Sequence, residues 1–84
     1  MIKINSHLKR QLQERPDEMF DLIVRTDGTA EPHLAWCEAN DLQVKRQYRL
    51  SPGLALCGRG EDALKLLDVD WVISVEPDAP VQAM

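Results

Sequence analysis

The order of strand-like and helix-like segments constrains the fold of this 84-residue chain more than any other feature. Four segments have the pattern of strands, and they are residues 19–26, 43–50, 54–57 and 71–75. Two segments have the pattern of short helices, one after the first strand and one after the third, at residues 32–40 and 61–67. In the first strand, Leu22, Ile23 and Val24 form a continuous apolar run, which is typical of a strand in the middle of a sheet. In the second strand, Val44, Arg46, Tyr48 and Leu50 alternate with Lys45, Gln47 and Arg49, so we expect one face of this strand to be more exposed to water.

A strand, helix, strand, strand, helix, strand order predicts a split βαβ arrangement. Two helices on one face of a four-stranded antiparallel sheet can bury one hydrophobic core. We therefore expect an α+β, ferredoxin-like domain over residues 19–78. The other face of the sheet has no cover in this chain, so it must be polar or contact a partner.

A separate helix is expected before this domain. Ser6 can cap a helix that runs to about Glu14, and Pro16 stops it. An apolar residue recurs at every fourth position, at Ile4, Leu8 and Leu12. Because this apolar stripe is narrow, we expect residues 1–18 to form an arm at the edge of the domain.

The composition argues against several classes of function. A net charge of −4 disfavours a binder of phosphate backbones, which needs clustered lysines and arginines. The four aromatic residues fall singly along the sequence, so we expect no base-stacking platform and no nucleic-acid partner. No run of 18 apolar residues is present, so no membrane span is expected. The first six residues lack the apolar core of a signal peptide, which predicts a cytoplasmic chain as given, or a secreted one if it is excised from a protease precursor.

No set of residues predicts catalysis, a metal site or a cofactor. His7 and His33 lie in different helices and are expected to be exposed or locally bonded. The spacing of Cys37 and Cys57 fits no zinc or redox motif, so we expect two small buried hydrophobic residues, with a disulfide as the alternative. The chain also has no glycine-rich phosphate loop, and we expect it not to be an enzyme.

The last strand is followed by an acidic and then an extended segment. Glu76-Pro77-Asp78 comes first, and residues 79–84 follow with the sequence Ala-Pro-Val-Gln-Ala-Met. Pro77 and Pro80 remove backbone donors and favour extended geometry. Residues 79–84 are therefore either a frayed end or a peptide that lies in the groove of another protein.

With this order of elements and this acidic ending, the chain resembles the subtilisin propeptide-like inhibitor family. This family contains the prodomains of subtilisin-type serine proteases and their free-standing relatives. The resemblance covers roughly residues 20–84, and residues 3–12 resemble the leader helix found ahead of some of these prodomains. The segments that carry it are residues 20–24, 48–56, 63–67 and 71–78.

The resemblance implies a way of binding a subtilisin-like protease. The open sheet face would dock on two protease helices, and carboxylates at the end of the last strand would cap the N-termini of those helices. Residues 79–84 would then enter the active-site cleft as an inhibitory tail, with Met84 just before the scissile bond and Val81 in an apolar pocket. The protease-binding residues implied in this way are Glu76, Asp78, Val81, Gln82, Ala83 and Met84. The chain would be an inhibitor or an intramolecular type of folding chaperone, and a monomer when free.

One feature departs from the family, and one alternative stays open. Family members run from the third strand to the second helix with few residues and a polar cap, whereas this chain has Gly58-Arg59-Gly60, which we expect to be a flexible connector. The alternative is a ferredoxin-like interaction or adaptor module that uses the same open sheet face without a protease. Such a module would not need residues 79–84.

Overall fold

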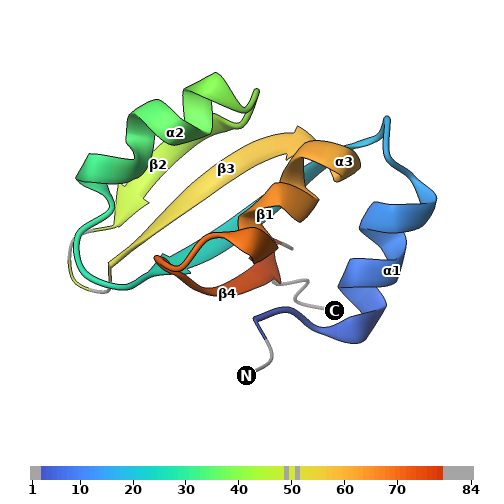
Figure 1. Cartoon of the computed structure of the whole chain (residues 1–84), viewed down its shortest axis with the longest axis horizontal. Helices are drawn as coiled ribbons and strands as arrows, with labels where there is room; N and C mark the ends of the chain where they lie inside the picture. The colour runs from blue at the N-terminus through green and yellow to red at the C-terminus, as the bar shows by residue number, and fades with distance from the viewer. Residues whose placement is uncertain (1–2, 49, 51, 79–84) are drawn as a thin grey trace, which may run out of the picture.

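The computed structural model describes residues 3–48, 50 and 52–78. Its elements, drawn in Figure 1, are α1 (Ser6–Glu14), β1 (Met19–Thr26), η1 (Glu31–His33), α2 (Leu34–Ala39), β2 (Gln43–Tyr48), β3 (Gly53–Arg59), α3 (Gly60–Ala63), η2 (Leu64–Asp68) and β4 (Val72–Pro77). The strands form one sheet in the order β2-β3-β1-β4, and all neighbours are antiparallel. Helices α2 and α3 lie on the same side of this sheet (Figure 1). The predicted α+β, ferredoxin-like split βαβ fold is confirmed.

Strand β1 lies inside the sheet, as its apolar run predicts. Leu22 lies opposite Leu56 of β3, and Val24 lies opposite Leu54, and all four side chains are completely buried under the helices. Ile23, between the two buried residues of β1, points to the other face, because successive side chains of a strand alternate. The helix side therefore holds the hydrophobic core, and β1 contributes the apolar residues Met19 and Ile23 to the opposite face.

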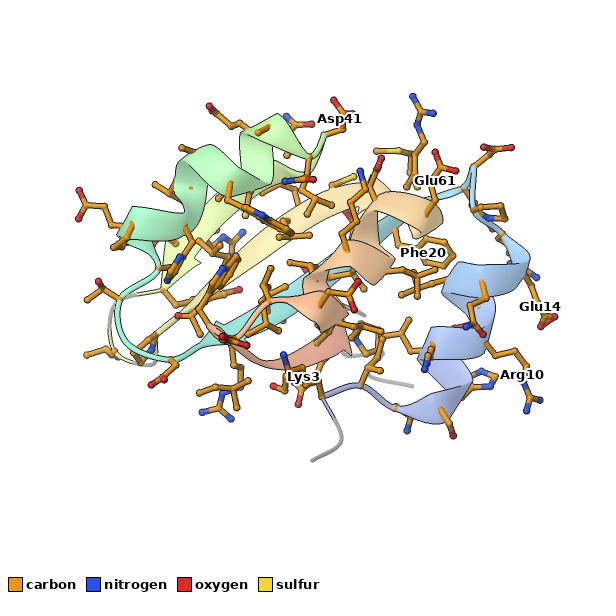
Figure 2. All side chains as sticks on the ribbon, in the orientation of Figure 1. Lys3, Arg10, Glu14, Phe20, Asp41 and Glu61 are labelled. Carbon is orange, nitrogen blue, oxygen red and sulfur yellow. The ribbon has the colours of Figure 1, made fainter. Side chains whose placement is uncertain are left out.

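The N-terminal segment joins both the sheet and the core. The helix cap is Asn5, whose Oδ1 accepts a hydrogen bond from the His7 N–H at 2.7 Å, so the prediction of Ser6 as the cap is wrong by one residue. Leu8 and Leu12 are buried, and Ile4 forms a parallel bridge with Val75 of β4. Figure 1 shows α1 beside α3, and Figure 2 shows Phe20 of β1 between these two helices. The arm therefore supplies part of the core.

The expected flexible connector is regular structure. Gly58 and Arg59 belong to β3, and Gly60 is the first residue of α3. A Cβ atom on Gly60 would lie 2.5 Å from the carbonyl oxygen of Leu12 and 2.6 Å from that of Arg15. Glycine is needed here because two backbones approach closely, so the prediction of flexibility is wrong.

Strand β2 departs from the strict alternation that its sequence indicates. The pairing with β3 shifts register between Val44, which lies opposite Leu56, and Arg46, which lies opposite Ala55. A bulge of this kind inserts one extra residue, so the residues on either side of it swap faces. Val44 consequently faces the helices, whereas Arg46 and Tyr48 face the other side of the sheet. The strand also ends at Tyr48 rather than at residue 50.

Candidate functional site: the open face of the sheet

No helix in the described part of the chain covers the second face of the sheet, which we call the open face. Its side chains come from all four strands and include Asp21, Ile23, Arg25, Gln43, Lys45, Arg46, Tyr48, Ala55, Cys57, Ser74 and Glu76. They lie in rows across the strands, because cross-strand neighbours on one face are close in space. The central row runs from Arg46 through Ala55 and Ile23 to Glu76.

At one end of the open face, the row of Tyr48, Gly53 and Arg25 borders a hollow of about 550 Å³. Gly53 has no side chain, so space remains between the longer side chains of its two neighbours. The hollow is also lined by Ile23, Arg46, Leu50 and Glu76. The described lining residues therefore combine apolar groups, an aromatic ring, two guanidinium groups and one carboxylate.

The other end of the open face carries a small charge network. The ammonium group of Lys45 lies 2.7 Å from Oδ1 of Asp21 and 4.0 Å from Oδ2 of Asp78. The hydrogen bond from Lys45 holds the pKa of Asp21 below its usual value, and the same bond raises the pKa of Lys45. Asp78 also continues the backbone pairing, since its N–H donates to the Asp21 carbonyl at 2.9 Å.

The two cysteines occupy different environments, and both thiols are free. Cys37 of α2 is fully buried, as predicted, and burial raises its pKa to about 11. Cys57 lies opposite Asp21 on the open face and is only half-buried, so the prediction that it belongs to the core is wrong. Partial burial, followed by the negative charge of Asp21, raises the pKa of Cys57.

The structure describes two of the six residues that the resemblance implies for protease binding. Glu76 is exposed on the open face, and Asp78, two residues later, is half-buried beside Lys45. The two carboxylates thus leave the same edge strand on the same side of the sheet. The remaining four, Val81, Gln82, Ala83 and Met84, lie outside the described residues.

Two groupings were not predicted from the sequence. The hollow depends on the β2 bulge, which brings Arg46 and Tyr48 to the same face as Arg25. The second grouping is aromatic: the ring of Trp71 stacks on His33 with centroids 4.1 Å apart and meets Trp36 edge-on at 5.4 Å. Because Trp36 and Trp71 pack against the hydrophobic core, this aromatic cluster stabilises the covered side of the sheet.

Within the described ranges, no helix is long and apolar enough to cross a bilayer. The same residues include no group of three histidine, cysteine, aspartate or glutamate side chains arranged to hold a metal ion. Comparison of the chain with protein-family models, curated proteins and solved structures gave no match.

Proposed function

We propose that this chain binds a subtilisin-like serine protease through its open face and inhibits the protease or assists its folding. The observation that supports the proposal best is the position of two carboxylates. Glu76 and Asp78 lie two residues apart at the end of an edge strand, on the face that no described helix covers. Residues 79–84 follow directly, and in this proposal they occupy the active-site cleft of the protease.

The physical basis is the anion-binding property of helix N-termini. The first N–H groups of a helix have no partner within the helix, and the aligned peptide dipoles place partial positive charge there. A carboxylate at such a position contributes about 0.3–1 kcal/mol when exposed and up to about 2 kcal/mol when partly buried. Asp78 already interacts with Lys45, so we expect Glu76 to contribute more to binding.

The test is the inhibition of subtilisin by the chain and by its Glu76→Gln, Asp78→Asn double variant. Subtilisin hydrolyses a peptide substrate, and the unmodified chain is expected to slow this hydrolysis at micromolar concentration. The double variant should bind more weakly by roughly 1–4 kcal/mol, which corresponds to about 5- to 1,000-fold. Its fold should change little, because surface substitutions usually shift stability by no more than about 0.5 kcal/mol.

A matched control separates docking from general charge. Glu14, at the end of α1 (Figure 2), and Asp17, three residues later, are both exposed. The Glu14→Gln, Asp17→Asn variant removes the same amount of charge from outside the open face. This control should inhibit as well as the unmodified chain. Absence of any inhibition would remove the protease proposal, and a folded Glu76, Asp78 variant with undiminished inhibition would remove the docking geometry.

The second candidate is an interaction or adaptor module that binds a partner other than a protease. The hollow favours it, because, apart from Glu76, its lining residues are not among those that the resemblance implies for protease binding. Deleting residues 81–84 distinguishes the two candidates. A protease inhibitor should lose much of its affinity on this deletion, whereas an adaptor should bind its partner unchanged.

A further inference from the structure

Two arginines of the open face lie around the same hollow. Arg25 comes from β1 and Arg46 from β2, and strand β3 runs between them. Arg25 lies opposite Gly53, and Arg46 lies opposite Ala55, two residues further along β3. Their backbones are therefore roughly 12 Å apart on the diagonal, since neighbouring strands are spaced by about 4.8 Å and each strand residue advances by about 3.4 Å. Gly53 lies between Arg25 and Tyr48 in the sheet and leaves the space above it open. Two long side chains can approach one bound group from opposite sides of this space.

The charges of these arginines are not neutralised within the described residues. No carboxylate there lies within 4.0 Å of either guanidinium group, whereas Lys45 on the same face lies within that distance of both Asp21 and Asp78. Among the described residues that line the hollow, Glu76 is the one carboxylate. The hollow is thus a positively charged spot on a chain whose net charge is −4. Guanidinium groups bind carboxylates well, because their planar donors match the two oxygens.

Apolar side chains border the same hollow. Ile23 and Tyr48 are half-buried, and Leu50 is fully exposed, with 102% of its reference accessible surface. Together, Leu50, Tyr48 and Ile23 give the hollow an apolar border. The chemistry of the hollow therefore calls for a ligand with both negative charge and an apolar side chain.

We propose that the hollow binds an acidic peptide segment of a partner protein. A carboxylate of that segment lies between Arg25 and Arg46, and an adjacent apolar side chain packs against Ile23, Tyr48 and Leu50. Nucleic acid fits this surface less well, because Tyr48 is its only described aromatic residue and offers a single ring for base stacking. The proposal does not require the partner to be a protease.

The test is an NMR titration of the full chain with a small probe peptide, acetyl-Glu-Glu-Leu-Glu-Glu-amide. The backbone amide signals of residues around the hollow should shift, among them those of Arg25, Arg46 and Gly53. The uncharged peptide with glutamine at each glutamate position should bind at least about tenfold more weakly, since it lacks the charge-assisted hydrogen bonds. Arg25→Gln and Arg46→Gln should each weaken binding roughly 3- to 10-fold.

Two variants make the outcome specific. Arg10 points outwards from α1 (Figure 2), so Arg10→Gln removes one positive charge far from the hollow and should leave the affinity unchanged. Glu76→Gln should strengthen binding of the acidic peptide, because it removes a carboxylate that lines the hollow. The same substitution is expected to weaken protease binding, so failure of one proposal can be distinguished from failure of the other.

Several results would overturn the proposal. One is the absence of shifts around the hollow, and another is equal affinity for the acidic peptide and its glutamine counterpart. Unchanged affinity in a folded Arg25→Gln, Arg46→Gln double variant would also contradict it. Tighter binding of a single-stranded oligonucleotide than of the acidic peptide, lost in the same double variant, would assign the hollow to nucleic acid instead.

Discussion

At the scale of single residues, Lys45 determines how much negative charge one end of the open face presents. Its ammonium group interacts with Asp21 and Asp78, and all three side chains are between 35% and 54% exposed. Ion pairs with this exposure contribute little to stability, because water and salt screen them. These ion pairs instead affect which carboxylates can bind a partner. Asp78 already interacts with Lys45, whereas Glu76 has no lysine or arginine within 4.0 Å in the described part of the chain.

The Lys45→Gln variant should change the titration of Asp21. Lys45 lowers the pKa of Asp21, so the stabilising effect of this bond is present above the usual carboxyl pKa and is lost as the pH falls through the folded-state value. The pKa of Lys45 is raised above 10.5, so its own contribution is present below that value and disappears as the pH rises through the folded-state pKa. Carbon-13 NMR of the aspartate carboxyl groups should show the pKa of Asp21 rising towards its usual value in Lys45→Gln. The control variant Lys65→Gln removes the partner of Asp62 and should leave the pKa of Asp21 unchanged. If the pKa of Asp21 is also unchanged in Lys45→Gln, the bond between Lys45 and Asp21 does not persist in solution.

At the scale of secondary-structure elements, Gly58 and Gly60 allow β3 and α3 to pack closely against neighbouring segments. Gly60 begins α3 next to the end of α1, and its N–H donates to the Glu18 carbonyl at 3.0 Å. Gly58 lies in β3, where an added Cβ would fall on Cδ2 of Leu42. An added methyl group would have to displace backbone atoms at Gly60. At Gly58 it would have to displace only the end of the flexible Leu42 side chain.

Gly60→Ala should therefore destabilise the chain more than Gly58→Ala. Overpacking a buried site typically costs about 1–3 kcal/mol, and Gly60 should be at the upper end because the carbonyl groups of Leu12 and Arg15 cannot rotate away. At Gly58 the leucine side chain can adjust, and the cost should be about 1 kcal/mol. Urea denaturation of both variants measures the difference. Equal stabilities would mean that α1 shifts freely over α3.

The elements show which parts of the structure a sequence can predict. Strand β1 was predicted at its observed bounds, because a continuous apolar run and a following Asp-Gly turn specify it locally. The bulge in β2 was not predicted, because no glycine or proline lies at that point of the sequence. The pattern of alternating residues also continues past the bulge without a break. The glycines were assigned to a flexible connector because a sequence does not show which backbone lies opposite a residue.

The same limit applies to the candidate site. Glu76 on the open face follows from strand alternation, because it lies next to the buried Val75. To predict the hollow, the bulge, the position of Gly53 and the order of the strands would all have to be known. Each of these depends on how the strands pair in the folded chain. The protease-binding role of Glu76 and Asp78 remains a prediction.

At the scale of the whole molecule, the N-terminal arm and the sheet form one core. The arm contributes Ile4, Leu8 and Leu12, and Leu12 is completely buried. The carbonyl of Lys3 also accepts a hydrogen bond from the Val75 N–H at 2.7 Å, which satisfies part of the outer edge of β4. A chain of this size buries only somewhat over 60% of its unfolded surface, so few apolar side chains can be lost without unfolding.

Removal of residues 1–18 should unfold the domain or nearly so. Burial of one large apolar side chain contributes about 1.5–3 kcal/mol, so the three lost side chains represent roughly 5–9 kcal/mol of a total stability that is typically about 5–15 kcal/mol. The single substitution Leu12→Ala should cost about 2–5 kcal/mol. Leu50→Ala is the matched control, because Leu50 is fully exposed and its loss should change stability by no more than about 0.5 kcal/mol. Denaturant titration followed by circular dichroism measures the stability of the truncated chain and of the two single variants. If the truncated chain unfolds at the same denaturant concentration as the full chain, the arm is peripheral, as its narrow apolar stripe predicts.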